Sequence, residues 1–225
     1  SILLTSLLIA LDSRCNDMGH QVSYLRKWSP KALRPLHLEI PFWLEDNCNH
    51  KVSNKSIFEV CDAKGKGAFK NGYDLAYFDP PYGTANIKTP TSRVRYFSYY
   101  HLWTTVIKND RPALIGAAKR REDVSSDSIE GAVSAFESTS KEKVVNAFSR
   151  LIRTCHTRYA LFSYSNRSKL TIRELIAVIE KEHTIIKVLS FKHAENSQAN
   201  TLINSQYKTF YEEENLEYLI LSKKE

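Results

Sequence analysis

The chain has 225 residues, of which 42% are apolar and 25% are charged, and its formal net charge is +7. This composition is typical of one globular domain with a sizeable core, and the basic excess favours a polyanionic partner. Its 4 cysteines show no Cys-x-x-Cys spacing, so neither a zinc site nor a disulfide framework is indicated. Cys48-Asn49-His50 could supply two metal ligands, but no second pair stands at a suitable spacing and a loop is favoured. We therefore expect no bound metal and a reducing, cytoplasmic compartment.

The N-terminal segment, residues 1–16, predicts a buried helix. Apolar residues recur there at helical spacing, namely Leu4, Leu7, Leu8, Leu11 and Cys15. The apolar run is too short to span a membrane and has no basic flank, so no membrane partner is expected. Residues 28–43 contain three prolines, which break a helix, and predict an extended connection.

Two short strands are predicted next. Residues 57–61 form an apolar run that ends at Asp62, and residues 73–78 form another that ends at Asp79-Pro80-Pro81-Tyr82. A polar loop, 83–95, then leads to the aromatic segment 96–103, which we expect to begin a helix. Residues 108–140 are charged and rich in serine without a sustained period, as in a long functional loop or a partly disordered insertion.

The last third of the chain alternates regular elements. Helices are predicted at 141–154 and 170–181, and strands at 159–164, 184–190 and 216–221. Strands that alternate with helices of this length predict an α/β fold with a mainly parallel sheet and helices on both faces.

The segment Asp79-Pro80-Pro81-Tyr82 is the most informative feature. It presents a carboxylate, a carbonyl and a phenol at the end of a predicted strand, where open α/β sheets bind their ligands. The prolines fix φ and lack backbone donors, so the Pro80 carbonyl is kept out of a helix. The trio suits a planar base with an amino group: Asp79 and the Pro80 carbonyl accept its two hydrogens and Tyr82 stacks on its face. A structural Pro-Pro turn with an incidental aspartate is the alternative.

The motif and its surroundings resemble the adenine-specific DNA methyltransferases that use S-adenosylmethionine. The matching segments follow in the same order as in that class, namely Val60-Cys61-Asp62-Ala63, Asp74-Leu75, Asp79-Pro80-Pro81-Tyr82, Tyr100-His101-Leu102, Phe162-Ser163-Tyr164-Ser165 and Glu217-Tyr218-Leu219. The resemblance covers nearly the whole chain and implies a Rossmann-like methyltransferase sheet. The sequence departs from the class in having Gly83 after Tyr82, a longer segment 84–97 and no cofactor glycines. We expect those glycines in an N-terminal part that is missing before Ser1.

The resemblance implies transfer of a methyl group to the 6-amino group of adenine in a restriction-modification system. The implied partners are double-stranded DNA with a flipped adenine and a cognate restriction endonuclease. The implied catalytic residues are Asp79, Pro80, Pro81 and Tyr82. The implied cofactor-binding residues are Asp62, Ala63 and Asp79, with a turn or helix cap as the alternative for Asp62.

Nucleic-acid contacts are expected in and around the loop 83–140. The candidate residues are Tyr82, His101, Lys108, Arg111, Lys119, Arg120 and Arg121. A histidine packed among tyrosines and a solvated basic loop are the structural alternatives. At the level of function, an RNA adenine methyltransferase with the same motif and a non-catalytic DNA-binding remnant remain open.

Overall fold

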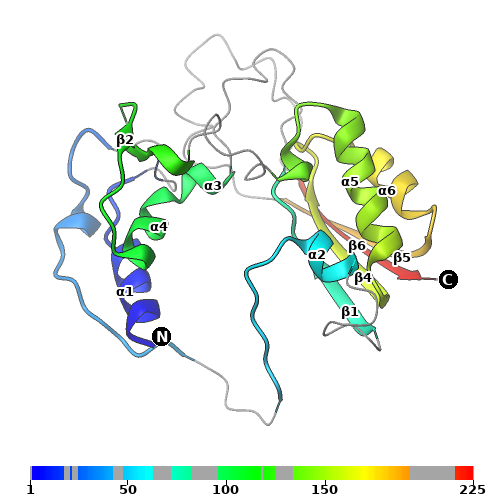
Figure 1. Ribbon diagram of the computed structural model, residues 1–225, viewed down its shortest axis with the longest axis horizontal. Helices are drawn as coiled ribbons and strands as arrows, with labels where there is room; N and C mark the ends of the chain where they lie inside the picture. The colour runs from blue at the N-terminus through cyan, green and yellow to red at the C-terminus, as the bar shows by residue number, and fades with distance from the viewer. Residues whose placement is uncertain are drawn as a thin grey trace. The chain divides into compact units, whose positions relative to one another are not determined.

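The computed structural model describes most of the chain, namely residues 2–17, 21, 25–42, 48–62, 72–82, 96–117, 119–124, 134–192 and 216–224. The described residues belong to two compact units, whose elements are drawn in Figure 1. The first unit combines the N-terminal segment with residues 96–124, and the second contains the larger sheet. The expected single domain over residues 1–225 stays a prediction, and the region 83–140 contributes elements to both units.

A mixed sheet of four strands forms the base of the second unit. Its strands are β1 (Tyr73–Phe78), β4 (Thr157–Ser165), β5 (His183–Lys192) and β6 (Leu216–Lys224). They lie in the order β1-β4-β6-β5, with β1 parallel to β4 and β6 antiparallel to both of its neighbours. The expectation of a mainly parallel sheet is thus corrected: β1, β4 and β5 run in one direction, but the insertion of β6 makes two of the three pairings antiparallel.

The second unit contains helices of different lengths, and the two longest begin at residues whose side chains cap them. The helices are α2 (Ile57–Asp62), α5 (Lys141–Thr154) and α6 (Ile172–Ile179), together with the short turn η3 (Ala135–Glu137). The Ser140 side chain accepts a hydrogen bond from the backbone N–H of Lys143 at the start of α5. Thr171 and Glu174 form a reciprocal capping box at the start of α6. The helices predicted at 141–154 and 170–181 are confirmed as α5 and α6, and α6 is shorter than its predicted range.

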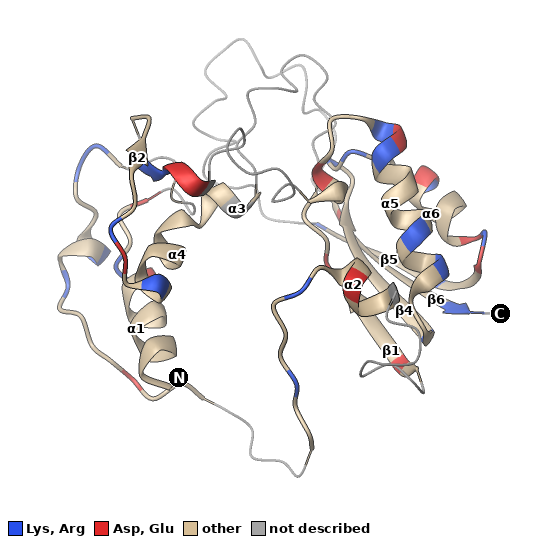
Figure 2. Cartoon of the chain, viewed as in Figure 1, with Lys and Arg blue, Asp and Glu red and all other residues tan. Residues whose placement is uncertain are grey.

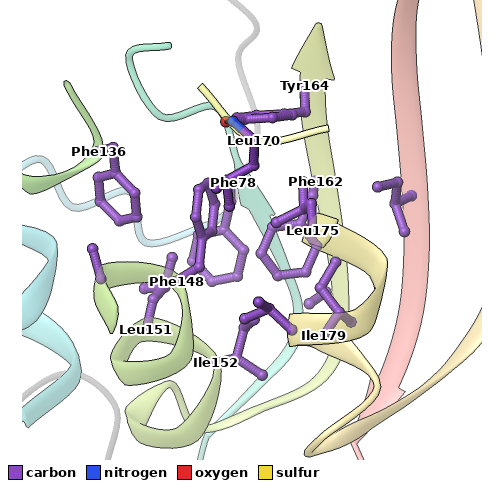
Figure 3. Close-up of a cluster of buried hydrophobic side chains, with 14 of the residues drawn as sticks. Phe78, Phe136, Phe148, Leu151, Ile152, Phe162, Tyr164, Leu170, Leu175 and Ile179 are labelled. Atoms are coloured by element: carbon purple, nitrogen blue, oxygen red, sulfur yellow. Dashed lines mark hydrogen bonds between the residues drawn. The ribbon is translucent and has the colours of Figure 1, made fainter. Parts of the chain in front are cut away.

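The core of the second unit lies between these helices and one face of the sheet. Figure 3 shows Phe148 and Ile152 of α5 close to Phe162 of β4 and Leu175 of α6. Phe78 of β1 packs against Phe162, with 5.0 Å between the ring centroids. Burial of one such side chain contributes about 1.5–3 kcal/mol. The core therefore fixes the end of β1, from which the Asp-Pro-Pro-Tyr segment continues.

The opposite face of the sheet carries exposed apolar side chains. They are Tyr73, Leu75 and Tyr77 of β1 and Leu189 and Phe191 of β5. Within the described residues, the helices of this unit join the core on the other face. Helices were expected on both faces of the sheet, whereas the helices among the described residues lie on one face only.

Residues Ile57–Asp62 form helix α2, so the strand predicted there is wrong. Ile57 and Cys61 lie one helical turn apart, and Cys61 is buried in the core. Phe58 stacks on Phe136, with 5.7 Å between the ring centroids. A short apolar run fits either a strand or a buried helix, and here packing against α5 and η3 selects the helix.

The first unit contains short elements. They are α1 (Ile2–Asp12), η1 (Pro30–Leu33), α3 (Tyr96–Tyr99), α4 (His101–Lys108), β2 (Leu114–Ile115), β3 (Arg120–Arg121) and η2 (Glu122–Val124). The helices predicted at the N-terminus and in the aromatic segment are confirmed, with α1 ending at Asp12. The expected burial of α1 is corrected, because its predicted apolar face is only half-buried and the buried residues of α1 are Ser6 and Ala10. Strands β2 and β3 pair antiparallel, so the expected irregular loop contains a hairpin, which turns through positive φ at Gly116 (68°) and Lys119 (51°). None of the described helices has the length and apolarity needed to cross a bilayer.

Candidate active site

The Asp-Pro-Pro-Tyr segment leaves the sheet at the carboxyl-terminal end of β1. This strand is paired in parallel with β4, and Phe78 lies opposite Phe162 in the register. Asp79, the next residue, is exposed, whereas Pro80 is buried. The turn is thus anchored by a buried proline while it presents a carboxylate at the end of two parallel strands, where ligands of open α/β sheets bind.

Tyr82 is fixed at both ends of its side chain. Its hydroxyl donates a hydrogen bond to Glu217 Oε1 at 2.6 Å and lies 3.4 Å from Asp79 Oδ1. Its ring meets Tyr164 edge-on, with 5.5 Å between the ring centroids. Burial raises the pKa of the Tyr82 phenol, and the hydrogen bond to Glu217 raises this pKa further. The phenol therefore stays protonated at neutral pH.

Glu217 and Ser163 are site residues that sequence reasoning missed. Both belonged to the ordered segments of the resemblance, but neither was predicted to contact the motif. Ser163 donates a hydrogen bond to Glu217 Oε1 at 2.9 Å. A signal was present in the sequence, because both polar residues interrupt strands that are otherwise mostly apolar.

The structure describes only some of the residues that were predicted to bind the cofactor. Asp62 ends helix α2 rather than a strand, which removes the strand-end argument for its role. The side chain of Asp62 and the whole of Ala63 lie outside the described residues. Asp79 and Glu217 place two carboxylates at this end of the sheet, and their negative charge fits the cationic sulfonium group of S-adenosylmethionine.

His101 lies in the interior of the first unit. The side chain is 4% exposed, and its Nε2 lies 2.9 Å from the backbone carbonyl of Gln21. The amide oxygen of Gln21 accepts a hydrogen bond from the backbone N–H of Leu102. Burial lowers the pKa of His101. The ring thus ties Gln21 to the start of α4, which favours the structural alternative for His101, and its contact with nucleic acid stays a prediction.

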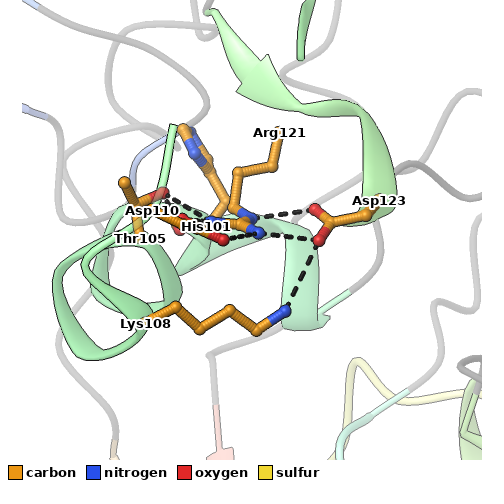
Figure 4. Close-up of polar contacts among 6 residues, drawn as sticks. All are labelled: His101, Thr105, Lys108, Asp110, Arg121 and Asp123. Carbon is orange, nitrogen blue, oxygen red and sulfur yellow. Dashed lines mark hydrogen bonds and ion pairs between the residues drawn. The ribbon is translucent and has the colours of Figure 1, made fainter. Parts of the chain in front are cut away.

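Arg121 is also buried, although it was predicted to contact phosphate. Figure 4 shows its guanidinium between Asp110 and Asp123, with Thr105 as a further acceptor. These contacts use all five N–H groups of the guanidinium. Arg121 is only 1% exposed and its donors are occupied, which argues against the predicted contact with phosphate.

The other predicted basic residues differ in their surroundings. Lys108 Nζ lies 3.5 Å from Asp123 Oδ2, so its charge is partly balanced. Arg111 and Lys119 are exposed, and Arg120 is half-buried. Figure 2 shows the acidic turn η2 directly after the basic strand β3. Arg111, Lys119 and Arg120 therefore remain the candidates for contact with a polyanion.

The described architecture is a mixed α/β fold that is compatible with a methyltransferase. The chain is 25% identical over 222 residues to the modification methylase LlaI of Lactococcus lactis subsp. lactis, covering 94% of this chain and 31% of that protein. It is 25% identical over 213 residues to the modification methylase StsI of Streptococcus sanguinis, covering 93% of this chain and 28% of that protein.

A third relative is the type II methyltransferase M.NlaIII of Neisseria lactamica. It is 26% identical over 180 residues, which are 80% of this chain and 46% of that protein. The chain thus spans about a third of the length of the first two relatives and just under half of the third. No family model matches the chain, and no solved structure matches it significantly.

Proposed function

We propose that this chain carries the catalytic motif of an adenine-specific DNA methyltransferase of a restriction-modification system. The observation that supports it best is the exposed Asp79 carboxylate in an Asp-Pro-Pro-Tyr segment at the end of β1. The similarity to modification methylases over more than nine-tenths of the chain supports the same class. The proposed methyl acceptor is the 6-amino group of adenine, and the proposed donor is S-adenosylmethionine.

Asp79 and Pro80 are proposed to activate the amino group. Its nitrogen is a poor nucleophile because its lone pair is delocalised into the ring. The Asp79 carboxylate and the Pro80 carbonyl accept the two amino hydrogens, which localises the lone pair on nitrogen. Positive charge that develops on this nitrogen is stabilised by the carboxylate. S-adenosylmethionine, when bound, supplies an electrophilic methyl group.

Tyr82 is proposed to hold the base. An adenine stacked in a duplex is out of reach of Asp79, so the base must be flipped out of the helix. An aromatic face gives a flipped base a stacking surface worth roughly 1–3 kcal/mol. The contacts of Tyr82 with Tyr164 and Glu217 fix the ring before the base arrives. A fixed ring aligns the amino group for attack, which raises the rate by orienting the reactants.

Substitution of Asp79 tests this function. In the full-length protein, Asp79→Ala should lower the rate of tritiated methyl incorporation into DNA by about 10²–10³-fold. The temperature of unfolding should stay unchanged, because Asp79 is exposed. Asp74→Ala is the matched control, since it removes an exposed carboxylate from β1, the strand that precedes Asp79.

The product decides between the proposal and its alternatives. Sequencing of modified bases should find 6-methyladenine in DNA from cells that express the full-length protein. Methyl groups on cytosine, or on RNA alone, would contradict the proposed substrate. A wild-type rate for Asp79→Ala would contradict the proposed catalytic role.

A further inference from the structure

A second carboxylate, Glu217, lies at the candidate active site. It is near the start of β6, far from the Asp-Pro-Pro-Tyr segment in the sequence. Because β6 runs antiparallel to β4, its first residues lie where β4 ends, and Glu217 is opposite Ser165. Since β4 is parallel to β1, this is also the end of the sheet at which Asp79 lies.

Glu217 accepts two hydrogen bonds through the same oxygen. Tyr82 donates to Oε1 at 2.6 Å, and Ser163 donates to it at 2.9 Å. Ser163 is 6% exposed, so its hydroxyl is held within the protein. Hydrogen bonds between two oxygen atoms are usually 2.5–3.0 Å long. The Tyr82 hydroxyl is therefore at full hydrogen-bond distance from Glu217 but only at 3.4 Å from Asp79.

The direction of this hydrogen bond matters for Asp79. A phenol that donates to Asp79 would compete with the amino hydrogens of a bound base for the carboxylate oxygens. A hydrogen bond to a charged group is worth about 1.5–3 kcal/mol, so the competition would be substantial. Because the phenol donates its proton to Glu217 at 2.6 Å, Tyr82 is not a strong donor to Asp79, 3.4 Å away, and the carboxylate is left to accept the amino hydrogens of a base.

The second consequence concerns the ring of Tyr82. The edge-on contact with Tyr164 limits the tilt of the ring, and the hydroxyl contact with Glu217 limits its rotation about Cβ. Tyr164 is itself fixed, because its hydroxyl accepts a hydrogen bond from the backbone N–H of Leu170. The stacking face of Tyr82 is thus set by groups from two strands, β4 and β6, and from the loop before α6.

We propose that Glu217 is a positioning residue that holds the Tyr82 hydroxyl and keeps it away from Asp79. The catalytic consequence rests on the proposed function, whereas the contact itself can be tested without methyl transfer. The test uses the full-length protein in a double-mutant cycle of Glu217→Ala and Tyr82→Phe. Glu217→Gln, which keeps an oxygen acceptor, is the conservative variant, and Glu180→Ala, at the exposed end of α6, is the matched control.

Kinetics measure the catalytic part of the proposal. Glu217→Ala should lower kcat by about 10–100-fold, as expected for a misplaced substrate, with little change in KM for S-adenosylmethionine. Glu217→Gln should keep kcat close to the wild-type value, because the amide oxygen can still accept the hydrogen bond from Tyr82. Once Tyr82→Phe has removed the hydroxyl, Glu217→Ala should cause less than about a twofold further loss. An equal loss of kcat with and without the Tyr82 hydroxyl would overturn the proposal.

Thermal unfolding measures the contact independently of activity. Glu217→Ala should lower Tm by about 2–4 °C when Tyr82 is intact and by less than half of that in combination with Tyr82→Phe. Additive shifts would show that the two side chains do not interact and would overturn the proposal. If the wild-type protein transfers no methyl group, the proposed function fails, while coupled shifts in Tm still support the contact between Glu217 and Tyr82.

Discussion

At the scale of single residues, Arg121 is the clearest case of a charge used for structure. Its guanidinium joins Asp110 beyond the end of α4 to Asp123 in η2. The hydrogen bonds from Arg121 lower the pKa of both carboxyls. A lowered carboxyl pKa means that the ionised form stabilises the fold, so the stabilisation is present at neutral pH and is lost as the pH falls.

We predict that Arg121→Ala lowers the Tm of the protein by several degrees at neutral pH, because it leaves two neighbouring carboxylates without their shared partner. The difference in Tm between wild type and variant should shrink as the pH falls below about 4, where the carboxyls become protonated. Arg111→Ala, which removes an exposed arginine, should leave Tm unchanged. A difference that persists at pH 2 would contradict the assignment to ion pairs.

The Asp-Pro-Pro-Tyr segment could be predicted from the sequence because its residues are consecutive and its chemistry is local. The contact of Tyr82 with Glu217 could not, since 135 residues separate the two and the position of β6 in the sheet decides it. The sequence left His101 open between a nucleic-acid contact and a histidine packed among tyrosines at a helix start. Only the fold shows that its ring points inward to Gln21.

At the scale of elements, length separates the helices that were predicted correctly from α2, for which a strand was predicted. The 14-residue pattern of α5 has a clear helical period and a capping serine, and its predicted ends agree with the structure. The 6-residue helix α2 is too short to show a clear helical period, and its apolar run fits a strand equally well. The antiparallel entry of β6 between β4 and β5 depends on long-range pairing and leaves no local signal.

The capping box of α6 leads to a prediction about this helix. Thr171→Ala removes the side chain that accepts from the Glu174 backbone N–H, and it should destabilise the protein by about 0.5–2 kcal/mol. Thr171→Ser keeps the hydroxyl and is the control. Denaturant unfolding measures both variants. Equal stability of the two variants would show that the cap contributes nothing to the fold.

At the scale of the whole molecule, the net charge of +7 favours a polyanionic partner, but some of the basic side chains already pair with carboxylates of the chain itself. Arg121 is occupied by Asp110 and Asp123, and Lys108 is close to Asp123. The exposed hairpin residue Lys119, the adjacent Arg120 and the exposed Arg111 lie in the same unit. These are the positions in the loop 83–140 from which we expect contacts to DNA phosphates.

The salt dependence of DNA binding by the full-length protein tests this expectation. Each phosphate contact releases counterions, so the loss of one contact should flatten the slope of log K against log salt concentration by roughly 0.9. We predict this change for Lys119→Gln and for Arg111→Gln, with equal effects on all duplex sequences, because phosphate contacts do not read bases. Lys181→Gln, on an exposed position of the second unit, is the matched control and should leave the slope unchanged. An unchanged slope for Lys119→Gln and Arg111→Gln would show that these two side chains are solvated and do not contact phosphate. A change in the target sequence would show that they contact bases instead.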